Sequence, residues 1–189
     1  AVMGKSGSGK STLFEVISSL LAPTSGKVYA TGKPSLALQD AESALFENIA
    51  ADDVAYGPEN LGLTGKELKE RVENSMNLCG IPFEKYKDRP IQMLSGGEKR
   101  KLALAGIIAM DSPIIILDEP SSALDPKSRI QFFELLQTLA QKGKTIIFST
   151  HRMEEAMIAD RIIRLHEGRI SSDSNPIKIP IDKSNYVEN

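Results

Sequence analysis

The residues best suited to chemistry in this sequence form a glycine-rich stretch near its start. They match the pattern G-x-x-x-x-G-K-[ST], whose glycines let successive backbone N–H groups turn inward around anionic oxygens. The stretch and the threonine after it comprise Gly4, Lys5, Ser6, Gly7, Ser8, Gly9, Lys10, Ser11 and Thr12. We expect Lys10 to contact the β- and γ-phosphates of a nucleotide and Ser11 to bind Mg²⁺. A flexible Gly/Ser turn is the alternative, but it does not explain the apolar strand before the stretch or the amphipathic helix pattern after it.

Two adjacent carboxylates, Asp118 and Glu119, follow a second apolar run at 114–117. Ligands of open α/β sheets bind at the carboxyl ends of the strands. Neighbouring residues on a strand point in opposite directions, so two adjacent acids can have different roles. We expect Asp118 to hold Mg²⁺ and Glu119 to polarise the attacking water. The alternative is an Asp-Glu helix cap after a core strand, which the phosphate loop makes less favoured.

A serine and two glycines, Ser95, Gly96 and Gly97, open another predicted helix. Backbone N–H groups and the helix dipole make such an N-terminus an anion site. One bound nucleotide does not obviously need a second anion site in the same small domain. An ordinary Ser/Gly N-cap is the alternative, and these residues alone leave both interpretations open.

The composition excludes several other kinds of site and partner. The 189 residues are 41% hydrophobic and 25% charged, as expected for one globular domain. A net charge of -2 provides no global basic field for nucleic acid or anionic lipid. Cys79 is the only cysteine, which excludes an intrachain disulfide and a multi-cysteine metal site. No apolar run approaches the roughly 20 residues that span a bilayer, so we expect any membrane role to come through a partner.

The elements that must position these residues alternate between strand-like and helical patterns. This alternation predicts an α/β fold with a mostly parallel sheet covered by helices. Strands are expected at 1–3, 27–30, 35–38, 114–117 and 145–148, with a terminal hairpin at 161–171. Helices are expected from the phosphate loop to about Leu21, from a Thr64–Glu67 capping box to Gly80, and at 97–110, 126–143 and 152–159.

Taken together, the motifs resemble those of the ABC ATPases. Residues 94–99, Leu-Ser-Gly-Gly-Glu-Lys, resemble the signature of that family. Gln39 looks like its Q-loop glutamine, residues 122–125 (Ser-Ala-Leu-Asp) look like its D-loop, and His151 looks like its switch histidine. The resemblance extends from residue 1 to about residue 171.

The resemblance implies that two ATPase domains pack head to tail, with each ATP between the phosphate loop of one and the signature of the other. Residues 95–97 would then bind the γ-phosphate held by the partner. Gln39 would contact Mg²⁺ and the attacking water and would sense a membrane partner. His151 would hold the γ-phosphate, and Asp125 would couple the two sites. Taken alone, Gln39 is equally an exposed residue at a strand end, and His151 a helix-cap residue.

The family also implies a domain organisation. We expect a three-layer phosphate-loop NTPase core over residues 1–171, a helical subdomain inserted at about 41–95, and a polar tail at 172–189. The family carries an adenine-stacking aromatic residue upstream of the phosphate loop. Nothing precedes Ala1 here, so we expect the native N-terminal strands to be missing. Gln39 follows the phosphate loop at short distance, so the early antiparallel region is expected to be trimmed.

The implied function is MgATP hydrolysis by a transporter subunit, peripheral at the cytoplasmic face of the membrane and coupled to separate membrane subunits. Leu45-Phe46 and residues 53–63 are similar to the ATPases of energy-coupling-factor importers, which take up vitamins and metals such as cobalt and nickel. A helix ended by Gly57-Pro58 and then a turn would explain the second segment equally well. The ATPase partner could be identical or different.

Three other functions remain as alternatives. A soluble ABC ATPase of DNA repair or translation usually carries long coiled-coil insertions or a second ATPase domain, neither of which is present in this sequence. A nucleotide-binding regulator without turnover would not need Glu119, His151 and an intact signature. A phosphoryl-transferring kinase would not explain the signature.

Overall fold

The computed structural model describes residues 1–37, 44–122 and 124–176, and its strands form two three-stranded sheets. The strands are β1 (Val2–Met3), β2 (Ser35–Ala37), β3 (Ile114–Leu117), β4 (Thr145–Phe148), β5 (Ile162–His166) and β6 (Arg169–Ser174). One sheet is parallel, in the order β2–β3–β4, with Leu117 opposite Phe148. In the other, β5 pairs in parallel with β1 and antiparallel with β6. A parallel bridge between Val2 and Ser149 links the two sheets.

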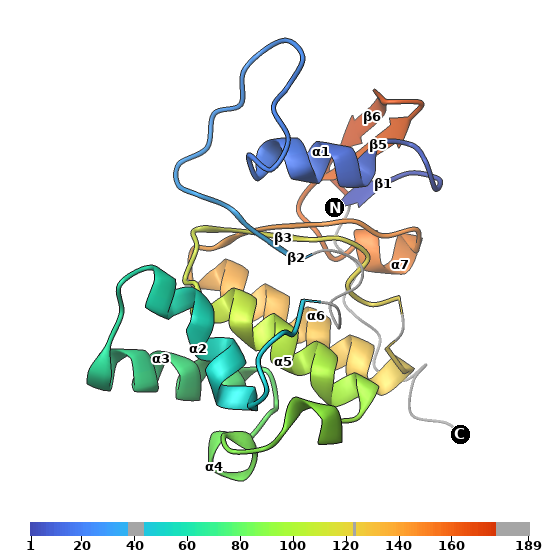
Figure 1. The fold of residues 1–189 in the computed structure, drawn as a ribbon. Coiled ribbons are helices and arrows are strands. Elements are labelled where there is room, and N and C mark those ends of the chain that lie inside the picture. Colours follow the sequence, from blue (N-terminus) through green and yellow to red (C-terminus); the bar gives the residue numbers. More distant parts are fainter. Residues whose placement is uncertain (38–43, 123, 177–189) are drawn as a thin grey trace.

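The strand β3 is buried on both faces and separates two layers of helices (Figure 1). The helices are α1 (Lys10–Ile17), α2 (Ala50–Asn60), α3 (Gly65–Leu78), α4 (Phe83–Tyr86), the 3-10 helix η1 (Ile91–Met93), α5 (Gly96–Ala109), α6 (Pro126–Gln141) and α7 (Met153–Ala156). Ile114 and Ile116 pack with Phe14 of α1 on one side. Ile115 and Leu117 join the larger core made with α2, α3, α5 and α6 on the other. The alternation of side chains along a strand thus explains the continuous apolar run.

A helical region made of α2, α3, α4 and η1 leads into α5 on the side of the sheet away from α1 (Figure 1). Val54 of α2 and Met76 of α3 are fully buried in the larger core. The start and end of this region lie side by side, because Ile49 forms an antiparallel bridge with Pro90 and Ala50 N donates to Arg89 O at 3.0 Å. Its two ends therefore return to nearly the same point.

Most of the elements expected from the sequence are confirmed. The parallel strands β2, β3 and β4, the helices α3, α5 and α6, and the β5–β6 hairpin lie within a few residues of their expected positions. Asp125 caps α6 as expected, since its Oδ1 accepts from Ser128 N at 3.0 Å, and Pro126 begins the helix. Long periodic segments with clear end signals are the patterns that a sequence encodes most directly.

Four local expectations are wrong. Residues 27–30 form no strand; Val28 and Tyr29 are exposed, and no strand among the described residues pairs with them. The first helix ends at Ile17 rather than near Leu21. The side chain of Thr64 makes no cap hydrogen bond to α3, so the expected capping box does not form. The hairpin continues to the end of β6 at Ser174, three residues past its expected end at residue 171. The tail beyond residue 176 and the residues around Gln39 lie outside the described part of the chain.

Candidate functional site

The glycine-rich stretch forms the turn between β1 and α1, and its glycines are required there by geometry. Gly7 and Gly9 have φ angles of 77° and 99°, in the left-handed region that favours glycine. A Cβ atom on Gly4 would lie 2.7 Å from Leu165 O, so the close approach of β5 also excludes a side chain. The turn therefore curls its backbone against β5 with no side chain filling these positions.

Lys10 lies inside this turn, with only 6% of its surface exposed. Its Nζ donates to Gly4 O at 2.9 Å and to Lys5 O at 3.3 Å. It also forms an ion pair with Glu119 Oε1 at 3.8 Å. A buried ammonium needs such partners because it has lost its water, and the result is a positive charge held within the turn.

The N-terminus of α1 opens into the same space. Its N-cap is Gly9, and no side chain caps the helix. Ser8 Oγ is buried and has no hydrogen-bond partner among the described residues. Uncapped N–H groups, the positive end of a helix dipole and an unpartnered buried hydroxyl together match an anionic oxygen ligand. The turn can therefore accept phosphate oxygens.

The carboxyl edge of β3 is joined to the turn by Asp118, which is 4% exposed. Ser11 Oγ donates to Asp118 Oδ2 at 2.5 Å, although the two residues lie 107 positions apart in the sequence. Asp118 Oδ1 accepts from Ser149 Oγ, which follows β4. The structure thus brings together Ser11 and Asp118, two of the three predicted metal ligands; the third, Gln39, lies outside the described residues. Among the described residues, no group of three or more His, Cys, Asp or Glu side chains is arranged to hold a metal ion.

Ser149 is a site residue that sequence reasoning missed. It is fully buried, donates to Asp118 and accepts from Glu119 N at 2.7 Å. Its single hydroxyl therefore holds the Asp118 carboxylate and the backbone of Glu119. The parallel register that sets Leu117 opposite Phe148 also places Ser149 beside Asp118. A serine at position 149 does not by itself predict a contact with Asp118, because that contact depends on which strand pairs with β4.

Glu119 lies between two cationic or potentially cationic side chains. Its Oε1 lies 3.8 Å from Lys10 Nζ, and its Oε2 lies 3.9 Å from His151 Nδ1. Its φ angle of 45° is left-handed, which is rare for a residue with a side chain and marks a strained turn. His151 is 59% exposed on its side chain, so the cluster opens to solvent. The structure brings together Lys10, Glu119 and His151, three of the predicted site residues.

The signature residues are held in a separate arrangement. Ser95 and Glu98 form a capping box at the start of α5: Glu98 N donates to Ser95 Oγ at 3.3 Å, and Ser95 N donates to Glu98 Oε2 at 2.8 Å. The hydroxyl of buried Tyr86 donates to Glu98 Oε1 at 2.5 Å. This bond and those from Ser95 lower the pKa of Glu98 to about 2. Gly96 and Gly97 are exposed.

The ordinary N-cap interpretation of Ser95 is therefore correct in geometry. It does not exclude anion binding, because nothing lies within 4 Å of a Cβ placed on Gly97. Figure 1 shows α5 and α1 on opposite sides of the parallel sheet. The signature thus lies apart from the phosphate loop of its own chain.

Two further predicted residues have different outcomes. Asp125 is at the surface, and hydrogen bonds from Ser128 lower the pKa of its carboxyl. Beside it, Arg129 Nη2 donates to Leu124 O at 2.9 Å. Gln39 lies outside the described residues, so the structure has no bearing on its predicted role.

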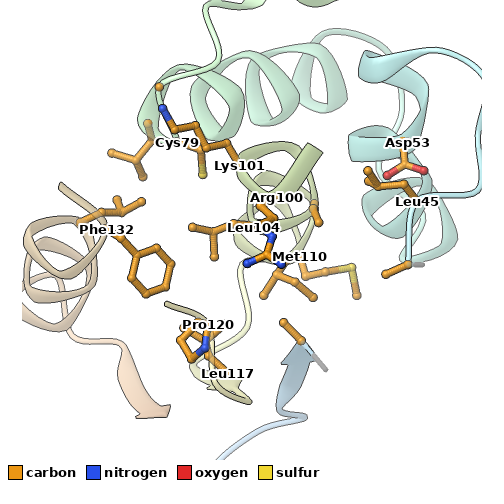
Figure 2. A pocket seen from close by; sticks show the side chains of 18 of the residues that line it. Leu45, Asp53, Cys79, Arg100, Lys101, Leu104, Met110, Leu117, Pro120 and Phe132 are labelled. Atoms are coloured by element: carbon orange, nitrogen blue, oxygen red, sulfur yellow. The ribbon is translucent and has the colours of Figure 1, made fainter. Parts of the chain in front are cut away.

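A cavity of about 700 Å³ lies between α5 and α6, at the carboxyl end of β3 (Figure 2). Leu104 and Met110 face Phe132 across it, and Arg100 also projects into it. Ala37 and Ala44 line it as well, so both ends of the segment that contains Gln39 reach its wall. The sequence had no signal for this cavity, because its walls come from helices far apart in the chain.

Comparisons with known proteins place this geometry in context. Residues 1–122 match the family described as "ABC transporter". The energy-coupling factor transporter ATP-binding protein EcfA2 of Clostridium perfringens (strain 13 / Type A) is 41% identical, over 92% of this chain and 67% of the relative. The corresponding protein EcfA1 of Caldanaerobacter subterraneus subsp. tengcongensis is 38% identical, over 94% and 69%.

Solved structures show the same fold. The protein cbiO1 from Clostridium perfringens, described as part of the ABC transporter complex cbiONQ, superimposes with a TM-score of 0.81 at 32% identity, over 93% of this chain and 77% of its own. A dimeric ATP-binding cassette in a post-hydrolysis state, bound to ADP and Pi, has a TM-score of 0.82 at 28% identity, over 92% and 83%. No helix within the described residues is long and apolar enough to cross a membrane.

Proposed function

Because this chain belongs to the ABC transporter family, we propose that it is the ATP-binding and ATP-hydrolysing subunit of an uptake transporter. The observation that carries the proposal is the position of Glu119 between Lys10 and His151, next to the Ser11–Asp118 pair. A carboxylate beside a phosphate site and a hydroxyl–carboxylate metal pair is the arrangement that phosphoanhydride hydrolysis requires. Relatives of this chain include two energy-coupling factor transporter ATP-binding proteins and cbiO1 of the cbiONQ complex, which supports vitamin or transition-metal import as the transported class.

The phosphates of ATP would lie in the turn at residues 4–9, against the start of α1. The unpartnered Ser8 hydroxyl and the uncapped N-terminus of α1 support this placement. Lys10 would exchange its bonds to the carbonyls of Gly4 and Lys5 for the β- and γ-phosphates. Backbone N–H groups at residues 5–12 would cradle the same oxygens.

Mg²⁺ fits the Ser11–Asp118 pair. Both supply the hard oxygen ligands that this ion prefers, and it usually takes only one or two protein ligands beside phosphates and water. Gln39 would complete the protein ligands, as the family resemblance implies. When bound, the ion would neutralise charge on the phosphate oxygens. Ser149 would keep Asp118 oriented toward it through the hydroxyl contact.

Hydrolysis would use Glu119 as the base. A water oxygen attacks the γ-phosphorus, the bond from that phosphorus to the bridging oxygen of ADP breaks, and the water proton moves to the Glu119 carboxylate. Lys10 and His151 lie on either side of Glu119, where they would stabilise the charge of the transferred phosphoryl group. The strained backbone at Glu119 fixes this orientation.

A second ATPase subunit would complete the site. Ser95, Gly96 and Gly97 are exposed on the opposite side of the sheet, so they are available to a γ-phosphate held by another chain. Asp125, at the surface before α6, would lie at the interface between the two sites. We assign the ATPase domain to residues 1–171, with the helical subdomain at about 41–95; the paired ends of the α2–η1 region support that insertion.

Separate membrane subunits would dock on the helical side, with the chain peripheral at the cytoplasmic face. The cavity between α5 and α6 supports this location, because its wall includes both ends of the segment that carries Gln39. Phe46 and Tyr56 stack edge to face near it, with 59% and 45% of their surfaces exposed. Exposed aromatic pairs of this kind are typical of protein contacts.

The test uses the native protein that contains this chain, with its partner ATPase and membrane subunits. Phosphate release from MgATP, together with co-purification of the membrane subunits, is the expected result. A complex that assembles but releases no phosphate would contradict the ATPase, and phosphate release without membrane subunits would favour a non-transport ABC ATPase.

A further inference from the structure

A buried carboxylate on α7 has no place in the site described above. Glu155 is 2% exposed, whereas its neighbour Glu154 is exposed. The two oxygens of Glu155 accept from two different segments: Oε1 from Ser121 Oγ at 2.7 Å and Oε2 from Thr150 Oγ1. A fully buried acid that joins two loops requires an explanation, because burial of a charge is unfavourable without a compensating arrangement.

The two loops are those that flank the reacting groups. Ser121 lies two residues after Glu119, and Ser122 N donates back to Glu119 O at 3.2 Å. Thr150 lies immediately before His151, and its Oγ1 also accepts from Arg152 N at 3.0 Å. The Glu155 carboxylate therefore links the two backbone segments that carry Glu119 and His151.

A third segment joins through Arg129 of α6. Arg129 Nε lies 3.4 Å from Glu155 Oε1, and its Nη2 donates to Leu124 O at 2.9 Å. Leu124 directly precedes Asp125, at the other end of the loop that begins with Ser121. Glu155 thus holds this loop at both ends, by a hydroxyl at one and a guanidinium at the other.

The charges explain why a carboxylate occupies this position. Arg152 Nε also lies 3.8 Å from Glu155 Oε1, so two guanidinium groups face one buried anion. The Nε atoms of Arg129 and Arg152 are both buried and have no hydrogen-bond partner within the described residues. The side chains of Arg129 and Arg152 are 17% and 35% exposed, and Arg152 Nη1 also lies 3.9 Å from Glu154 Oε1. Without Glu155, both partly buried guanidinium groups would lose a compensating charge, and the loops would rearrange to hydrate them.

We propose that Glu155 is a positioning residue that holds His151 together with Ser121 and Leu124, so that these two residues near the proposed subunit interface and the histidine at the γ-phosphate move together. This inference rests on the proposed ATPase function. His151 is itself largely exposed, so its orientation depends on the anchored residues beside it. Glu155 contacts none of Lys10, Ser11 or Asp118, so it should affect turnover and not nucleotide binding.

The first experiment compares Glu155→Gln with Glu154→Gln in the native protein and its partner ATPase. Glutamine keeps the size, but its amide nitrogen cannot accept the second hydroxyl, and the negative charge is lost. We expect kcat of phosphate release to fall roughly ten- to hundredfold, with KM for MgATP and the affinity for a fluorescent ATP analogue within about twofold. Glu154→Gln should match the parent throughout. A parental kcat in Glu155→Gln would overturn the inference.

A double-mutant cycle with His151→Ala distinguishes positioning from general loss of structure. If Glu155 acts through the histidine, Glu155→Gln should change kcat little once His151 is absent. An equal fold-loss in both backgrounds would overturn the proposal. Amide hydrogen exchange should also rise at 121–125 and 150–152 in Glu155→Gln only.

If Glu155→Gln does not fold, Ser121→Ala serves the same cycle, because it removes one bond to the carboxylate and keeps the charge. A several-fold loss of kcat that disappears in the His151→Ala background supports the proposal, and a parental kcat overturns it. Hydrolysis absent from the unaltered protein would instead overturn the proposed function, whereas hydrolysis that is present and insensitive to Glu155 would overturn only this inference.

Discussion

The phosphate-loop region and the signature region are both helix N-termini rich in glycine and serine, yet they are held in opposite ways. At the phosphate loop, Ser11 bonds to Asp118 across 107 positions of sequence, and Ser149 bonds to the same carboxylate from another strand. At the signature, Ser95 bonds to Glu98 three positions away. One region is assembled by the tertiary fold and the other by its own sequence.

The two regions also differ in whether a side chain caps the N-terminus of the helix. The N-terminus of α1 lacks a side-chain cap, and the buried Ser8 hydroxyl beside it has no hydrogen-bond partner in the described part of the chain, so both can bind an anionic ligand. The N-terminus of α5 is already capped by Ser95 and Glu98, so it is stable without a ligand. A stable, exposed second anion site is what a site shared between two subunits would require, because it must persist in the separate chain.

The largest effect is expected from a substitution that removes the catalytic base of the phosphate-loop region but leaves its structure intact. Glu119→Gln should still bind MgATP and dimerise, but turnover should fall about 100- to 10,000-fold because the base is lost. Sizing chromatography with MgATP and a phosphate-release assay would measure the two properties. Asp118→Asn should instead weaken the dependence on Mg²⁺. A Glu119→Gln protein that hydrolyses normally would mean that another group acts as the base.

The next prediction concerns a substitution that disrupts the signature region and leaves the phosphate-loop region intact. Ser95→Arg should lower turnover about 100- to 1,000-fold, because a bulky cation would block the donors offered to the partner's γ-phosphate. Binding of ATP to the separate chain should be unchanged, since the phosphate loop lies on the other side of the sheet. Asn60→Arg adds the same charge at another exposed helical position and should be inert. Weaker ATP binding in Ser95→Arg would argue against two separate regions.

A smaller effect is expected on nucleotide affinity. Lys10→Ala removes the ammonium that is buried within the turn, and a hydrogen bond from a charged group contributes about 1.5–3 kcal/mol, or roughly 10- to 150-fold in affinity. Calorimetry with MgATP would measure it, and exposed Lys27→Ala is the matched control. Parental affinity in Lys10→Ala would show that the lysine stays on its own carbonyls when the nucleotide binds.

The smallest expected effect tests the local bonds of the signature. Tyr86→Phe removes the main cause of the low pKa of Glu98, so this pKa should rise from about 2 toward its ordinary value of 4.5. Because the folded-state pKa is lowered, Glu98 stabilises the fold above pH 4.5, and this contribution is lost as the pH falls toward 2. The melting-temperature difference between parent and Tyr86→Phe should therefore shrink over that range.

Carboxyl NMR titration of Glu98 measures the shift directly. Tyr29→Phe is the control, because Tyr29 is 87% exposed and lies outside the helical region. A pKa of Glu98 that stays near 2 in Tyr86→Phe would mean that the bonds from Ser95 suffice to hold the carboxylate.

Some expectations failed for reasons that a sequence does not contain. Residues 27–30 have a strand-like composition, but a strand is stable only when another strand pairs with it, and none among the described residues does. Thr64 and Glu67 have the spacing of a capping box, yet the threonine side chain makes no cap bond. The same spacing at Ser95 and Glu98 does form one. A local sequence pattern thus allows a strand or a capping box to form, and the tertiary contacts around it decide whether it does.

The sequence by itself determined the features whose causes are local: the glycine turn, the two acids after β3, the signature cap and the periodic helices. Only the tertiary structure decided which of these meet. Ser149 reaches Asp118, and Glu155 reaches Ser121, because β3 and β4 pair in a register that neither segment encodes alone. The physical reason is that these two hydrogen bonds join residues 31 and 34 positions apart, so their geometry exists only after the sheet has formed.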